Sequence, residues 1–146
     1  MKKEYAYAQI FLRLALGIGF IYPVLDRIGW LGPADGNNIG WGDWPTFLNY
    51  THILLPIFSK SISDTFGLIA TIAEVVFAIL LIVGYKTKLA SIGSFILLFG
   101  FATCMAITLG LKAPFNYSVF TASAAALLLS CVNEYKWSLD NLKSKL

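Results

Sequence analysis

Runs of apolar residues alternate with short polar or glycine-containing stretches along the whole chain. Four of these runs have about the twenty residues that an α-helix needs to cross a bilayer. They cover residues 6–25, 65–83, 89–109 and 115–132. The links "GYKTK" and "GLKAPFN" between the last three are short, which makes consecutive helices antiparallel neighbours. The pattern predicts an all-α integral membrane four-helix bundle, formed by residues 1–146 as a single transmembrane domain.

The first link, residues 26–64, is much longer than the others and has two parts. Its first half, "GWLGPADGNNIGWGDWP", is rich in the Gly, Pro, Asn and Asp of turns. In its second half, Asp43 is suited to cap a short helix with Pro45 in the first turn. That helix is apolar enough to lie in the membrane interface but too short and polar to span it. We interpret it either as a lid over the outer mouth of the bundle or as a passive interfacial loop.

The basic residues near the helix ends predict the orientation. Cytoplasmic ends of membrane helices carry an excess of Lys and Arg. Three basic residues fall on one side, Arg27, Lys60 and Lys112, and seven on the other, Lys2, Lys3, Lys86, Lys88, Lys136, Lys143 and Lys145. Both termini are therefore predicted to be cytoplasmic, in a multi-pass protein of the plasma membrane, the inner membrane of a bacterium.

Composition supports a membrane protein. Hydrophobic residues make up 58% of the chain and charged residues only 13%, about half of the charged share of a soluble domain. So few charges cannot cover the surface of a soluble globule, so the lipid bilayer is the expected surrounding. The net charge of +3 is too small to indicate nucleic-acid binding.

Two charges interrupt the apolar runs. Arg13 lies roughly 12 Å from the cytoplasmic end of the first run and Glu74 roughly 15 Å from the same face in the second, at about 1.5 Å per residue. Arg13 shares one helix side with Ala6, Gln9 and Gly17. A lone charge in the bilayer is costly, and an Arg–Glu pair removes much of that cost. The two side chains are therefore predicted to form an ion pair.

The predicted pair has two interpretations. In one it is a structural clamp that fixes helix register. In the other, Arg13, Glu74 and Gln9 line a polar pocket for a ligand, because intramembrane ionisable residues usually serve function. No nucleophile–base pair, phosphate loop or metal-ligand spacing is visible, so the sequence identifies no catalytic residue.

Further candidates lie on the outer side: Asp26, Arg27, His52 and Trp44. Asp26 and Arg27 follow Pro23 at the end of the first helix. They have three interpretations: they hold the loop in place, they line an outer site, or they form a solvated helix end, which we favour. His52 is the only histidine, so a haem held by two histidines of this chain is excluded. A metal centre built from His and Cys is not expected either.

Two stretches, "RLALGIGFIY" and "AEVVFAILLIVGYKTKLAS", resemble the DoxX family of small four-helix membrane proteins over nearly the whole chain. The aromatic first link, with "GDWPTFL", is more similar to DoxD-type members, which resemble the small subunit of thiosulfate:quinone oxidoreductase. The resemblance implies a quinone-interacting subunit beside a soluble or periplasmic redox partner, without a covalently bound cofactor. It carries over Arg13 and Glu74 as site residues. The stretch "YPVLDRIG" departs from the Gly and Lys that many relatives have there.

Three functions follow from these observations. The first is a quinone-interacting subunit of a membrane oxidoreductase. The second is a non-catalytic protein that binds or transports a small lipophilic or anionic molecule, with Arg13 holding the anion. The third is a scaffold that anchors a redox partner. The ligand, the electron donor, the partner protein and any homo-oligomeric state stay open at the level of the sequence.

Overall fold

The computed structural model describes residues 3–34 and 40–143, and within them the chain forms helices and no strand. Lys2 and Lys145, two of the predicted cytoplasmic lysines, lie outside these ranges. The seven helices are α1 (Lys3–Arg27), α2 (Trp44–Leu54), α3 (Lys60–Val83), α4 (Thr87–Thr108), α5 (Lys112–Asn116), α6 (Val119–Ser130) and α7 (Leu139–Lys143).

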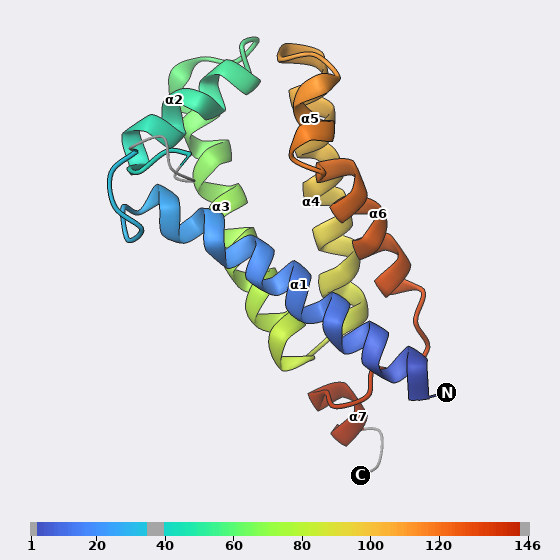
Figure 1. Cartoon of the computed structure of the whole chain (residues 1–146). Coiled ribbons are helices and arrows are strands. Elements are labelled where there is room, and N and C mark those ends of the chain that lie inside the picture. Colours follow the sequence, from blue (N-terminus) through green and yellow to red (C-terminus); the bar gives the residue numbers. More distant parts are fainter. Residues whose placement is uncertain (1–2, 35–39, 144–146) are drawn as a thin grey trace.

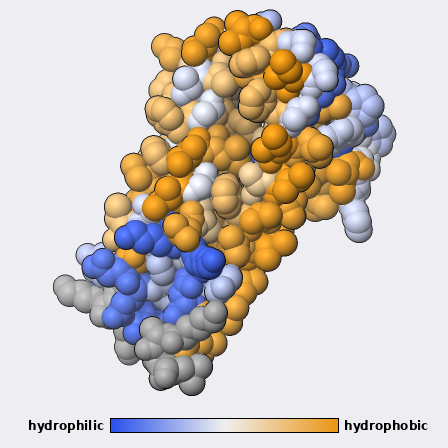
Figure 2. Space-filling view, turned by 180° about the vertical axis from the view of Figure 1, so that it is seen from behind, coloured by the Kyte–Doolittle hydropathy of each residue, from blue (hydrophilic) through white to orange (hydrophobic). Residues whose placement is uncertain are grey.

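Three helices, α1, α3 and α4, are long and apolar enough to cross a membrane. Large hydrophobic side chains remain exposed along all three, including Phe11, Ile72 and Ile96. Figure 2 shows a hydrophobic band across the middle of the molecule, with hydrophilic residues gathered at the lower end. An apolar surface of this extent is not stable in water, which indicates a membrane protein.

The sequence predicted a single helix for the fourth apolar run, residues 115–132, but in the structure this run does not form one helix. It is divided into α5 and α6, because Tyr117 ends the first and Ser118 has a left-handed backbone with φ 54°. At about 1.5 Å per residue, the twelve residues of α6 extend roughly 18 Å. This is shorter than the hydrocarbon core of a bilayer.

The helices pack mainly as two pairs, α1 with α3 and α4 with α6, which meet through contacts of α3 with α4 and of α1 with α6. In Figure 1, α1 crosses the molecule obliquely, from the end that holds α7 toward the end that holds α2. We call these the α7 end and the α2 end. Small residues lie where the helices approach closely: Ala78, Ala102 and Ala126 are fully buried.

The predicted short helix in the long link is present as α2. Asp43 precedes it with extended backbone and accepts a hydrogen bond from the backbone N–H of Thr46 at 2.7 Å, and Pro45 lies in its first turn. This is the N-cap arrangement expected from the sequence. Phe47 and Thr51 are buried where α2 packs against α3, so α2 covers that part of α3.

At the α7 end, the C-terminal segment, residues 134–143, closes over the turn between α3 and α4. The Asp140 carboxylate accepts hydrogen bonds from the backbone N–H groups of Lys86 and Thr87, both at 2.8 Å. These N–H groups lie at the start of α4, where a helix has no partners of its own for them. The backbone N–H of Asp140 in turn donates to the Gly84 carbonyl. Asp140 therefore caps α4 from more than fifty residues away in the sequence.

This cap predicts a pH dependence. Burial acts to raise the pKa of Asp140, but hydrogen bonds from Thr87 and Lys86 and the charge of Arg13 outweigh it, so that the pKa lies below the ordinary value of 3.8. The stabilisation is therefore complete above the unfolded pKa and is lost as the pH falls through the folded pKa. Acidification below about pH 4 should release the C-terminal segment.

The release is measured by the fluorescence of Trp137, whose ring lies 5.4 Å from that of Tyr7, in a variant with the other three tryptophans replaced by Phe. We expect the Trp137 fluorescence to change in an acid transition. In Asp140→Asn this transition should be absent, because the spectrum of the released segment is already present at neutral pH. Glu134→Gln, which alters an exposed carboxylate of the same segment, should keep the transition. An unchanged transition in Asp140→Asn would show that this cap does not control the segment.

Candidate functional site

The structure separates the two residues that the sequence predicted to pair. Arg13 is 1% exposed and Glu74 is 3% exposed, so both are buried as expected. Arg13 hydrogen-bonds backbone carbonyls at the α7 end, whereas Glu74 pairs with Arg27. The predicted Arg13–Glu74 ion pair is therefore wrong.

Arg13 closes the last turn of α3. Its Nε donates to the Leu81 carbonyl at 2.9 Å and its Nη2 to the Ile82 carbonyl at 3.2 Å. Carbonyls in the last turn of a helix lack intrahelical partners, and a cation there also interacts favourably with the helix dipole. Arg13 is thus a capping residue supplied by a neighbouring helix.

The same guanidinium holds the C-terminal segment. Its Nη1 lies 3.2 Å from the Lys136 carbonyl and 3.4 Å from the Trp137 carbonyl. Gln9 supports it by donating to the Lys136 carbonyl at 2.9 Å. All three nitrogens of Arg13 therefore have protein partners, which favours the structural over the ligand-binding role for Arg13 and Gln9.

The predicted ion pair was wrong because it assumed that the start of α1 and the end of α3 lie at the same level. The first turns of α1 instead extend beyond the last turn of α3, where they meet the C-terminal segment. Arg13 consequently lies beside Leu81 and Ile82, and Glu74, two turns earlier in α3, lies further along α1. The stripe of Ala6, Gln9, Arg13 and Gly17 does face protein as predicted, since all four residues are buried.

Glu74 forms its ion pair with Arg27 at the α2 end. Arg27 Nη1 donates to Glu74 Oε2 at 2.5 Å and to Thr71 Oγ1 at 2.8 Å, and Nη2 lies 3.3 Å from Glu74 Oε1. The guanidinium thus meets the carboxylate with both terminal nitrogens, the two-point geometry that Arg favours. Arg27 Nε is buried and has no hydrogen-bond partner among residues 3–34 and 40–143.

Aromatic rings cover this ion pair. The guanidinium carbon of Arg27 lies 4.1 Å from the ring centre of Phe47 and 5.1 Å from that of Trp41. Both distances fit cation–π contacts, which strengthen where water is excluded. The two rings are themselves in edge contact, with centres 5.4 Å apart. We call Arg27, Glu74, Thr71, Trp41 and Phe47 the buried cluster.

Asp26 places the loop that carries Trp41. Its carboxylate accepts three backbone N–H groups, from Gly40 at 2.9 Å and from Trp41 and Gly42 at 3.0 Å each. Gly42 has φ 70° and packs directly against the backbone of Ala34, so a side chain does not fit there. Asp26 is 4% exposed and Arg27 3% exposed, so their interpretation as a solvated helix end is wrong.

The remaining outer candidates lie around the cluster. His52 Nδ1 is 3.0 Å from Ser63 Oγ, which links α2 to the first turn of α3. Trp44 packs its ring against Phe47, with centres 5.2 Å apart. His52 therefore helps to hold α2 in place over α3, whereas Trp44 supports the Phe47 ring from within α2.

A signal for Arg27 was present in the sequence. Arg27 follows Arg13 by fourteen residues, which is close to four helical turns. The two arginines therefore share one face of α1 if the helix continues to residue 27, whereas the prediction ended it at residue 25. The position of Asp26 at the end of the first helix offered the interpretation that it holds the loop in place. Its exact partners had no signal, because they are backbone N–H groups of that loop.

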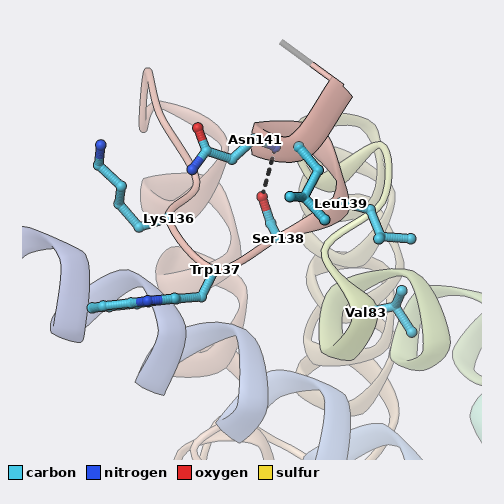
Figure 3. Close-up of a pocket in the computed structure, with 7 residues that line it drawn as sticks. Val83, Lys136, Trp137, Ser138, Leu139 and Asn141 are labelled. Atoms are coloured by element: carbon cyan, nitrogen blue, oxygen red, sulfur yellow. Dashed lines mark hydrogen bonds between the residues drawn. The ribbon is translucent and has the colours of Figure 1, made fainter. Parts of the chain in front are cut away.

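A shallow pocket of about 560 Å³ lies beside the C-terminal segment, far from the buried cluster. In Figure 3, the polar ends of Lys136 and Asn141 lie on one side of Ser138, and the side chains of Leu139 and Val83 on the other. The pocket is at the α7 end, so it does not open onto Glu74 or Arg27. It belongs to the surface that Arg13 holds in place.

Within residues 3–34 and 40–143, no group of three His, Cys, Asp or Glu side chains is arranged to hold a metal ion. Comparison with protein-family models, with curated proteins and with solved structures finds no match for this chain. The function must therefore be argued from the buried cluster itself.

The new pairing predicts the outcome of a double-mutant cycle. Removing one partner leaves a buried charge, so Arg27→Gln and Glu74→Gln should each lower the free energy of unfolding by about 3–5 kcal/mol. Their combination should cost clearly less than the sum. The control cycle of Arg13→Gln with Glu74→Gln should be additive within about 0.5 kcal/mol. Unfolding in detergent micelles measures both cycles, and stronger coupling to Arg13 would contradict the structure.

Gly84 tests the Arg13 cap. It ends α3 with φ 73°, and a side chain there would collide with the Arg13 guanidinium and Ser138. Gly84→Ala should cost about 1–2 kcal/mol for the left-handed backbone and more for displacing Arg13. Gly100→Ala, in α4 with open space around it, should be neutral or slightly stabilising. Equal melting temperatures for the two variants would contradict the cap.

Proposed function

We propose that this chain is a membrane subunit that binds a quinone at the buried cluster and takes part in a membrane oxidoreductase system. The observation that carries the proposal is the Arg27–Glu74 pair, buried between apolar helices beneath two aromatic rings. Ionisable residues inside a membrane usually serve function. The resemblance to the DoxX family, on the stretch that contains Glu74, supports the same proposal.

The proposal includes a topology. Helices α1, α3 and α4 cross the membrane, and α5 with α6 completes the fourth crossing of a four-helix bundle. The α7 end faces the cytoplasm, because the basic residues Lys86, Lys88 and Lys136 lie at or beside it. The α2 end then lies on the outer side of a bacterial inner membrane, where a soluble or periplasmic redox partner can reach it.

The cluster offers the chemistry that a quinone needs. Reduction of a quinone to a quinol takes up two electrons and two protons, and here the electrons come from the redox partner. Glu74, once it is protonated by water, can pass one proton to a ring oxygen of the quinone, and Arg27 stabilises the carboxylate that remains. The second proton comes from water. The chain supplies binding, orientation and proton transfer, while the quinone and the partner supply the redox change.

Access to the cluster requires α2 to move. Phe47 of α2 packs over Arg27, and Phe47 and Thr51 are both buried where α2 meets α3. A lipophilic tail can remain in the bilayer beside α3 while the head group enters beneath α2. This assigns α2 the role of a lid, one of the two interpretations that its sequence left open.

Quinone retention tests the proposal. Protein purified in mild detergent should carry a membrane quinone, enriched over the bulk lipid and detected by mass spectrometry of the lipid extract. Glu74→Gln should lose most of this quinone and slow quinone reduction in membranes that contain the native partner. Asp64 lies in the same helix but forms an exposed pair with Lys60. Asp64→Asn should therefore retain both the bound quinone and the wild-type rate of quinone reduction.

Two outcomes separate the alternatives. Quinone that is bound but never reduced would favour a non-catalytic carrier of lipophilic molecules. No enrichment in the wild type, together with unchanged reduction in Glu74→Gln, would overturn the proposal and favour a scaffold.

A further inference from the structure

Among the residues that the structure describes, the charges around the buried cluster do not balance. Arg27 carries one positive charge, and the carboxylates of Glu74 and Asp26 carry two negative charges when ionised. All three residues are 4% exposed or less, so solvent screens them weakly. Lys60, at the start of α3, is exposed and already paired with Asp64, so it does not neutralise the excess.

We infer that the ligand of this cluster has an uncharged head group with a hydrogen-bond-acceptor oxygen, and that Asp26 is the residue that excludes anions. The inference deepens the proposed quinone-binding function and rests on it. The sequence left open a second function, binding or transport of a small lipophilic or anionic molecule. The inference excludes anionic molecules from that function.

The acceptor follows from the hydrogen bonds of Arg27. Its Nη1 and Nη2 groups are used by Glu74 and Thr71, while the Nε–H is buried without a partner. An unsatisfied buried donor is unfavourable, so an oxygen placed there is stabilised. A carbonyl or ether oxygen can accept from this N–H once α2 has moved, whereas a cationic head would face the guanidinium directly.

The absence of charge follows from the two carboxylates. An anion at Arg27 Nε would lie near both Glu74 and Asp26, and one arginine cannot offset two carboxylates and an anion. With an effective dielectric constant of about 20, any like charge within about 10 Å of an anion weakens its binding by at least about tenfold. Anion-binding sites in proteins usually carry the opposite excess.

Asp26 disfavours the binding of anions through its negative charge, and it also positions Trp41. Its three N–H partners fix residues 40–42, so that the Trp41 ring lies against Arg27. The rings of Trp41 and Phe47 then offer apolar faces beside the Nε–H donor of Arg27. A flat, uncharged ring with one acceptor oxygen matches this combination.

Two probes with the same ring test the charge preference. 2-Methoxy-1,4-naphthoquinone is neutral, whereas 2-hydroxy-1,4-naphthoquinone is an anion at neutral pH. Binding to the full-length chain in detergent is measured by calorimetry, with protein-free micelles as the blank for partitioning. The wild type should bind the neutral probe at least about tenfold more tightly than the anion.

Asp26→Asn should lower the ratio of the affinity for the neutral probe to the affinity for the anionic probe, because removing one negative charge strengthens binding of the anion. The asparagine keeps one oxygen that can accept hydrogen bonds from the loop. Its fold is checked by helical circular dichroism and gel filtration. Asp64→Asn should keep the wild-type ratio. The wild-type comparison stands by itself if Asp26→Asn does not fold.

The outcomes are distinguishable. Equal or tighter binding of the anion by the wild type overturns this inference but leaves quinone binding intact. An unchanged ratio in folded Asp26→Asn overturns the role of Asp26. Failure of both probes to bind overturns the proposed quinone site together with the inference.

Discussion

Polar groups inside a membrane protein need partners from the protein, and the fold depends on how α1 supplies them to α3. Arg13 donates to the carbonyls of Leu81 and Ile82 at the end of α3, and Arg27 pairs with Glu74 further along the same helix. Without water, an unmatched carbonyl or charge costs several kcal/mol. These two contacts determine where α1 crosses α3, and α2 and the C-terminal segment pack around them.

The sequence was sufficient for the elements whose causes are local. Apolar length predicted α1, α3 and α4, and Asp43 with Pro45 predicted α2. The buried stripe of α1 was predicted from helical periodicity. The break between α5 and α6 was missed, because a single left-handed residue, Ser118, has no apolar pattern of its own. Serine is not a residue that usually adopts this backbone.

The candidate site was harder to predict because its partners are distant in the chain. Burial of Arg13 and Glu74 followed from their surroundings, but their partners depend on how far α1 slides along α3. If α1 slid along α3 by a few helical turns, Arg13 would lie beside Glu74 in place of Arg27, because both arginines lie on the same face of α1. Asp26 and Asp140 bind backbone N–H groups, which every residue has, so no sequence pattern marks these contacts. Tertiary geometry alone assigns them.

The partners of Arg13 also have a consequence for synthesis. Two of its four backbone acceptors, the carbonyls of Lys136 and Trp137, lie more than 120 residues later in the chain. The first helix therefore enters the membrane with an arginine whose hydrogen bonds form only after α3 and the C-terminal segment have been made. Until then the helix carries the cost of a charge in lipid, which favours its retention in the insertion machinery until its partners arrive.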